Sequence, residues 1–64
     1  MIRTYDITLH MKFRLHGVSW AVTGGLKENL GERDTVLVRP DGIAYGKERR
    51  MLVKTITTAE LICH

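Results

Sequence analysis

Residues 5–15 of this 64-residue chain read YDITLHMKFRL and alternate strictly between apolar and polar side chains. Every odd position from Tyr5 to Leu15 is apolar, and every even position from Thr4 to His16 is polar. Because successive side chains of a β-strand point to opposite faces of a sheet, this pattern predicts a strand with one buried and one solvated face. The last even positions are basic, so the solvated face becomes positive toward the end of the strand.

A second strand is predicted to follow a two-residue loop at His16-Gly17, because glycine adopts positive φ freely and histidine does so more readily than most residues. This loop sets a register that pairs apolar residues on the buried face: Leu15 with Val18, Phe13 with Trp20, and Met11 with Val22. On the solvated face it pairs Arg14 with Ser19 and Lys12 with Ala21. A slip of one residue would move Trp20 among the charges, so the pattern specifies the register well.

The middle of the chain begins with Gly24-Gly25, which is expected to end the second strand. Residues 26–30 carry two leucines four positions apart, a spacing that favours a helical turn or two. Thr23 is then a candidate cap for its start. The segment is too short to form an isolated helix, so it must either pack on the sheet or form a compact loop.

Further strands are predicted where β-branched and apolar residues gather, at 35–39, 43–45 and 50–57. The turn residues Pro40-Asp41-Gly42 and a loop at 46–49 separate them. After the last strand, Thr57 and Glu60 fit a capping box that would start a short C-terminal helix. A continued strand through the C-terminus fits equally well.

The expected fold is therefore one small domain over residues 1–64, mainly β, with the element order ββαβββ. About five short antiparallel strands would curl into a barrel-like or sandwich-like domain with one short helix. An α+β arrangement of the β-grasp type, with the helix lying across one sheet, has the same order and remains the alternative.

Size and cysteine content limit how the chain can be stabilised. A core of this size rarely supplies more than about 3–5 kcal/mol, and Cys63 has no second cysteine with which to form a disulfide. We therefore expect association with a partner or a homodimer to add stability. The sequence has no long apolar run, so we expect no membrane partner. Its lone thiol leads us to expect an intracellular, cytoplasmic protein.

Basic residues gather in two segments, which give the candidate binding site. The chain has a net charge of +3, and residues 1–23 and 43–64 are basic, whereas 24–42 are slightly acidic. The candidates for phosphate contact are His10, Lys12, Arg14, Lys47, Arg49, Arg50 and Lys54. The first hypothesis is a small basic module that binds nucleic acid, or an acidic protein surface, through a positive sheet face and loop.

Catalysis and metal binding have little support in the sequence. His10, His16, Cys63 and His64 lack the spacing of a structural zinc site, and no motif for nucleophilic catalysis or cofactor binding is present. We therefore expect no enzyme activity, no cofactor and no metal. The alternative hypothesis is a protein-binding regulator or homo-oligomer component, for example one encoded by a mobile element, that uses open sheet edges.

Overall fold

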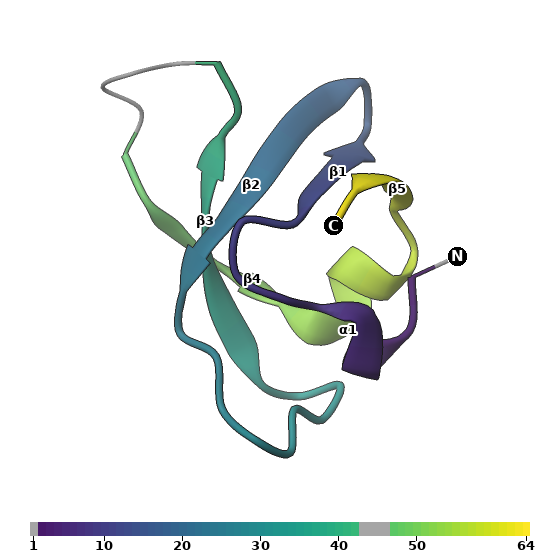
Figure 1. The fold of residues 1–64 in the computed structure, drawn as a ribbon, viewed down its shortest axis with the longest axis vertical. Coiled ribbons are helices and arrows are strands. Elements are labelled where there is room, and N and C mark those ends of the chain that lie inside the picture. The colour runs from purple at the N-terminus through teal and green to yellow at the C-terminus, as the bar shows by residue number, and fades with distance from the viewer. Residues whose placement is uncertain (1, 43–46) are drawn as a thin grey trace.

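The computed structural model describes residues 2–42 and 47–64, which form one antiparallel sheet with a short helix (Figure 1). The strands follow the order β4-β3-β2-β1-β5 across the sheet, and the two edge strands, β4 and β5, do not pair with each other. The elements in chain order are the 3-10 helix η1 (Thr4–Asp6), β1 (Lys12–Leu15), β2 (Val18–Gly24), β3 (Thr35–Pro40), β4 (Arg49–Leu52), α1 (Val53–Thr57) and β5 (Glu60–Cys63). The prediction of a mainly β fold with about five short strands and one short helix is confirmed, but the sheet is not closed into a barrel.

The β1–β2 hairpin has the predicted register. Phe13 pairs with Trp20, and Lys12 pairs with Ala21. The loop residues His16 and Gly17 have φ values of 50° and 78°, as a turn with two left-handed residues requires. The alternation and the loop therefore predicted the pairing correctly, although Val18, expected on the buried face, is 44% exposed beside the turn.

The first strand is shorter than predicted. It begins at Lys12 rather than near Tyr5, whose side chain is 75% exposed in η1. The Asp6 carboxylate accepts the Arg3 N–H at 3.2 Å, a local bond that competes with an extended backbone. Leu9, also predicted to be buried, is 48% exposed in the turn before β1.

This turn redirects the chain through a left-handed residue, His10, with φ of 70°. The Met11 N–H donates to the Thr8 carbonyl at 3.1 Å, and the His10 N–H donates to the Val22 carbonyl at 2.9 Å. Val22 in turn donates its N–H to the Met11 carbonyl at 2.9 Å. Two residues, His10 and Met11, are thus hydrogen-bonded to the single residue Val22. This arrangement is a β-bulge, and it places His10 outside the regular strand.

The core lies on one side of the sheet, where η1 and α1 contact each other (Figure 1). It combines residues from the sheet with residues from the segments that cover it: Ile2, Ile7, Met11, Phe13, Val22, Val36, Val38, Val53, Ile56 and Ala59. Trp20 is half-buried and packs against this cluster. The opposite side of the sheet carries the polar partners of the alternating strands.

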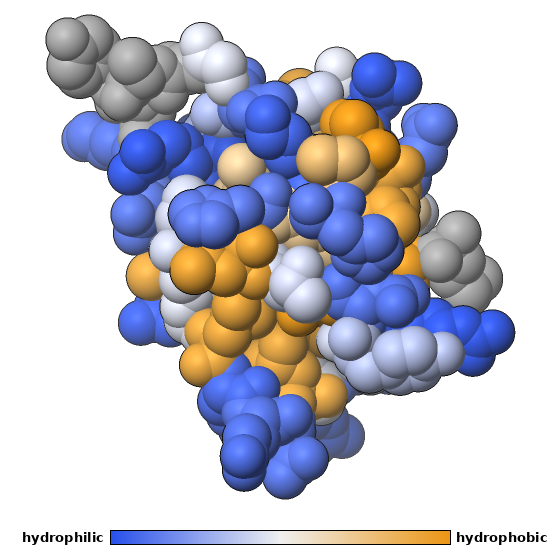
Figure 2. Space-filling model, viewed as in Figure 1, coloured by the Kyte–Doolittle hydropathy of each residue, from blue (hydrophilic) through white to orange (hydrophobic). Residues whose placement is uncertain are grey.

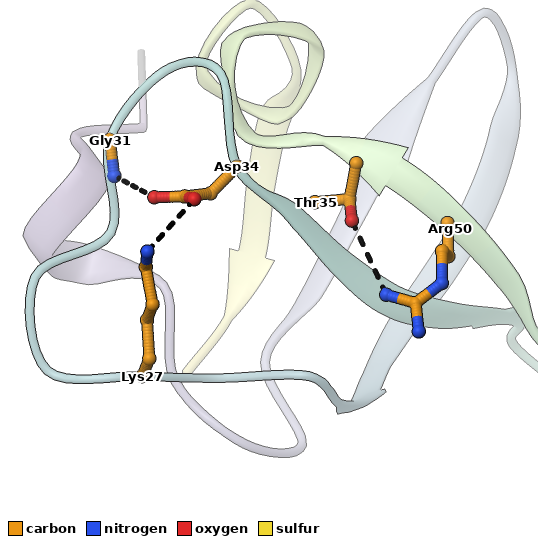
Figure 3. Close-up of polar contacts among 5 residues, drawn as sticks. All are labelled: Lys27, Gly31, Asp34, Thr35 and Arg50. Atoms are coloured by element: carbon orange, nitrogen blue, oxygen red, sulfur yellow. Dashed lines mark hydrogen bonds and ion pairs between the residues drawn. The ribbon is translucent and has the colours of Figure 1, made fainter.

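The helical turn predicted at 26–30 is wrong, and so is the cap at Thr23, which belongs to β2. Residues 25–34 form an irregular loop, the alternative that the sequence left open. The loop is closed by Asp34, whose carboxylate accepts the Gly31 N–H at 2.7 Å and lies 3.0 Å from the Lys27 ammonium (Figure 3). The Gly31 N–H and, next, Lys27 hold the pKa of Asp34 below its usual value, because both favour the carboxylate. These bonds stabilise a loop where the leucine spacing favoured a helix.

The third strand and the turn after it agree with the prediction. The strand β3 spans Thr35–Pro40, and Gly42 has φ of 82° in the turn. The predicted strand at 43–45 lies outside the described residues. Of the predicted loop at 46–49, Arg49 already belongs to β4.

The predicted strand at 50–57 is correct only to Leu52, where β4 ends and α1 begins. The first helical N–H groups find partners in the β2–β3 loop: Val53 donates to the Asp34 carbonyl at 2.9 Å, and Lys54 donates to the Glu32 carbonyl at 3.1 Å. These tertiary bonds satisfy groups that a short helix otherwise leaves open. The helix therefore lies between the fourth and fifth strands, instead of between the second and third.

The C-terminal segment forms the strand β5, one of the two alternatives that the sequence left open. The capping box at Thr57 and Glu60 is wrong, because Thr57 is the last residue of α1 and Glu60 is the first of β5. The Thr57 hydroxyl donates instead to the Lys54 carbonyl at 2.7 Å. The strand β5 pairs with β1 and forms the second edge of the sheet.

Candidate nucleic-acid interface

The side of the sheet that faces away from the core is the candidate interface, and we call it the outer face. The strand registers place Lys12, Ala21 and Arg39 next to one another across β1, β2 and β3. The same alternation places Arg14 beside Ser19 on this face. Between β3 and β4, two cross-strand pairs lie on the outer face, Leu37 with Arg50 and Thr35 with Leu52.

Three cations of the outer face lie near carboxylates. The Lys12 ammonium is 3.6 Å from Asp41, and the Arg14 guanidinium is 3.8 Å from Glu60. The Arg39 guanidinium donates to Glu48 at 3.2 Å. Exposed pairs of this kind contribute only about 0–1 kcal/mol each, so an incoming anion can compete for these cations.

Arg50 differs from these three cations in its partner. Its guanidinium donates to the Thr35 hydroxyl at 3.4 Å, across β3 and β4 (Figure 3). This is a long bond to a neutral oxygen, at the outer limit of hydrogen-bond geometry. Arg50 is therefore an exposed cation that, within residues 2–42 and 47–64, bonds a neutral hydroxyl and forms none of the ion pairs of this face.

The seven predicted contact residues do not all share one face. Lys12, Arg14 and Arg50 lie on the outer face, and the exposed Lys47 precedes β4. The other three lie elsewhere: Arg49 with its guanidinium 5.8 Å from the centre of the Trp20 ring, His10 in the bulge before β1, and Lys54 on α1.

Arg39 is an outer-face cation that is not among the residues predicted from the sequence. In the strand predicted at 35–39, Val36 and Val38 are fully buried, whereas Leu37 and Arg39 lie on the outer face. This alternation is the signal that could have identified Arg39.

A second surface feature lies between η1 and the β2–β3 loop. It is a shallow cavity of about 360 Å³ lined by Thr4, Tyr5, Ile7, Lys27, Glu28, Asn29 and Leu30. The Arg3 guanidinium lies 6.0 Å from the centre of the Tyr5 ring at its rim. Figure 2 shows one side of the molecule, on which apolar surface is exposed near β5 and in the lower half, bordered by hydrophilic side chains.

Within residues 2–42 and 47–64, no three His, Cys, Asp or Glu side chains converge as they would to hold a metal ion. None of the helices in this part of the chain has the length and apolar character needed to cross a membrane. No protein-family model, curated protein or solved structure matches the chain.

Proposed function

We propose that this protein is a small, non-catalytic binding module that contacts the phosphate backbone of nucleic acid through its outer face. The observation that carries the proposal is the register that brings Lys12 and Arg39 to either side of Ala21, with Arg14 and Arg50 on the same face. In this proposal the protein acts in the cytoplasm and needs no cofactor.

The spacing of the cations suits a polyanion. Neighbouring strands lie about 4.8 Å apart, so the backbones of Lys12 and Arg39 are separated by roughly 10 Å, with only the small Ala21 between them. Lys12 and Arg14, two residues apart on β1, are separated by about 7 Å. Because Ala21 is short, the long cationic side chains around it can reach several phosphates at once.

The size of the molecule sets the length of the target. Its longest dimension is 29 Å, which corresponds to roughly eight or nine base pairs of duplex at about 3.4 Å each. Two to four phosphate contacts within this length predict a slope of about −2 to −4 for log affinity against log salt concentration.

The test is fluorescence anisotropy with labelled duplex DNA and duplex RNA of about 16 base pairs, titrated with protein between about 20 and 200 mM salt. We expect binding that weakens linearly on the logarithmic plot, and a smaller slope for the double variant Lys12→Gln/Arg39→Gln. Arg33→Gln is the matched control, because it removes one exposed positive charge from the β2–β3 loop. Absence of binding to either duplex at the lowest salt would reject the proposal.

A second candidate function, protein binding or self-association, is favoured by apolar side chains exposed on both edge strands. Leu52 on β4 is 46% exposed, and Ile62 on β5 is 43% exposed. Light scattering tests self-association: a mass of two chains, restored to one by Leu52→Gln or Ile62→Gln, would support this candidate. A single-chain mass at high concentration would exclude the homodimer.

A further inference from the structure

We infer that Arg50, together with the Thr35 hydroxyl, forms the anchoring phosphate site of the outer face. This inference rests on the proposed function and specifies which of its cations makes the strongest contact. The ligand is a phosphate group of the nucleic-acid backbone.

The first argument is the partner of each cation. Lys12, Arg14 and Arg39 each lie within 4 Å of a carboxylate oxygen, so a phosphate that reaches them must displace a negative charge already there. Among the described residues of this face, Arg50 is the cation paired with a neutral hydroxyl. Because a guanidinium carries five donors, the single 3.4 Å bond to Thr35 leaves most of them free for a bidentate contact with phosphate.

The second argument is the apolar surroundings of Arg50. Leu37 lies directly across from it on β3, and Leu52 follows two residues later on the same face of β4. Leu37 is half-buried and packs over Gly24, where a β-carbon would lie 3.6 Å from the Leu37 side chain. Apolar neighbours lower the local dielectric, which strengthens the attraction between the guanidinium and a phosphate relative to a fully hydrated cation.

The third argument is the chemistry of Thr35. Its hydroxyl oxygen accepts the Arg50 N–H, which leaves the hydroxyl proton free to be donated to a phosphate oxygen. Arg50 and Thr35 can therefore hold one phosphate from two adjacent strands. This two-point contact fixes position on the backbone without recognising sequence.

The experiment compares Arg50→Gln with Arg39→Gln in the duplex-binding assay at about 0.1 M salt. Loss of one full phosphate contact at this salt lowers affinity by up to about eightfold. We expect a loss near this value for Arg50→Gln, a loss of less than about threefold for Arg39→Gln, and no significant change for Arg33→Gln. Arg50→Lys should fall between wild type and Arg50→Gln, because it keeps the charge but loses the fork.

Two more variants test the partners. Thr35→Val should lower affinity less than Arg50→Gln does, by removing one donor. Glu48→Gln should raise affinity, because it frees the Arg39 guanidinium from its 3.2 Å contact. Urea midpoints confirm that each variant is folded; Arg50 is exposed, so its loss should change stability by less than about 0.5 kcal/mol.

The outcomes separate this inference from the proposed function. If the wild-type protein binds duplex but Arg50→Gln loses no more affinity than Arg39→Gln or Arg33→Gln, the anchoring role of Arg50 is wrong and the module still binds nucleic acid. If the wild-type protein binds neither duplex at low salt, both are wrong. A larger effect of Arg39→Gln would move the anchor to the centre of the sheet.

Discussion

Replacing Ile56 with valine tests whether the short helix α1 is part of the core. Ile56 is fully buried, as is Val53 one helical turn earlier on the same helix. In an extended segment, Ile56 would instead share a face with Leu52, which is 46% exposed. The substitution Leu52→Val removes the same single methylene only four residues away, so it is a matched control.

The magnitude follows from burial. Loss of one buried methylene by Ile→Val costs about 0.5–1.5 kcal/mol, whereas an exposed substitution stays within about 0.5 kcal/mol. A core this small supplies about 3–5 kcal/mol in total, so Ile56→Val removes a large share of the stability. With an m-value of about 1 kcal/mol per molar urea, the midpoint should fall by roughly 1 M.

The assay is urea unfolding of the two variants and the wild-type protein, followed by circular dichroism and by Trp20 fluorescence. We expect a clear decrease in the midpoint for Ile56→Val and almost none for Leu52→Val. Equal shifts for the two variants would show that Ile56 and Leu52 share an environment, which would contradict the helix and its place in the core.

Substitutions at Gly25, Asp34 and His10 test backbone geometry and the loop, with Gly17→Ala as a control. Gly25→Ala should destabilise the protein more than Gly17→Ala in urea unfolding: both residues have positive φ, but a β-carbon at Gly25 would lie 2.9 Å from a backbone nitrogen of β3, whereas at Gly17 it would meet nothing within 4 Å. Asp34→Asn should destabilise the protein at pH 7, because the Gly31 N–H lowers the pKa of the folded-state carboxyl. That stability is present above the unfolded-state pKa of about 4 and is lost as the pH falls through the folded-state pKa, so the difference between wild type and Asp34→Asn in midpoint should shrink at pH 3 or below. His10→Val should lower the thermal midpoint and His10→Gly should preserve or raise it, because φ at this residue is 70° and a β-branched residue adopts that conformation poorly.

The β1–β2 hairpin could be predicted because all the information lies within about a dozen neighbouring residues. The alternation fixes which side chains are buried, and the His16-Gly17 loop fixes which residues face one another. A different register would bury Lys12 or expose Phe13, each at a cost that a small core cannot offset. The same alternation failed before residue 10, since a local bond of Asp6 and the left-handed His10 end the extended backbone there.

The position of the helix could not be predicted, because distant residues determine it. Residues 50–57 contain β-branched side chains that favour a strand, yet Val53 and Lys54 donate their N–H groups to carbonyls of the β2–β3 loop. Those carbonyls, from Asp34 and Glu32, are about twenty residues away in the sequence and are held in place by the loop that Asp34 closes. Intrinsic preference was therefore overridden by tertiary hydrogen bonds that no local pattern contains.

The charge of the candidate interface shows the same limit. Counting charges along the chain identified Lys12 and Arg14 as part of a basic segment, but their partners Asp41 and Glu60 come from other segments. Folding brings a carboxylate from the turn after β3, and another from β5, onto the face that the sequence predicted to be simply positive. The cations of the outer face therefore differ in their partners rather than in their charge. Arg50 is bonded to the neutral Thr35 hydroxyl, whereas Lys12 and Arg14 lie beside carboxylates.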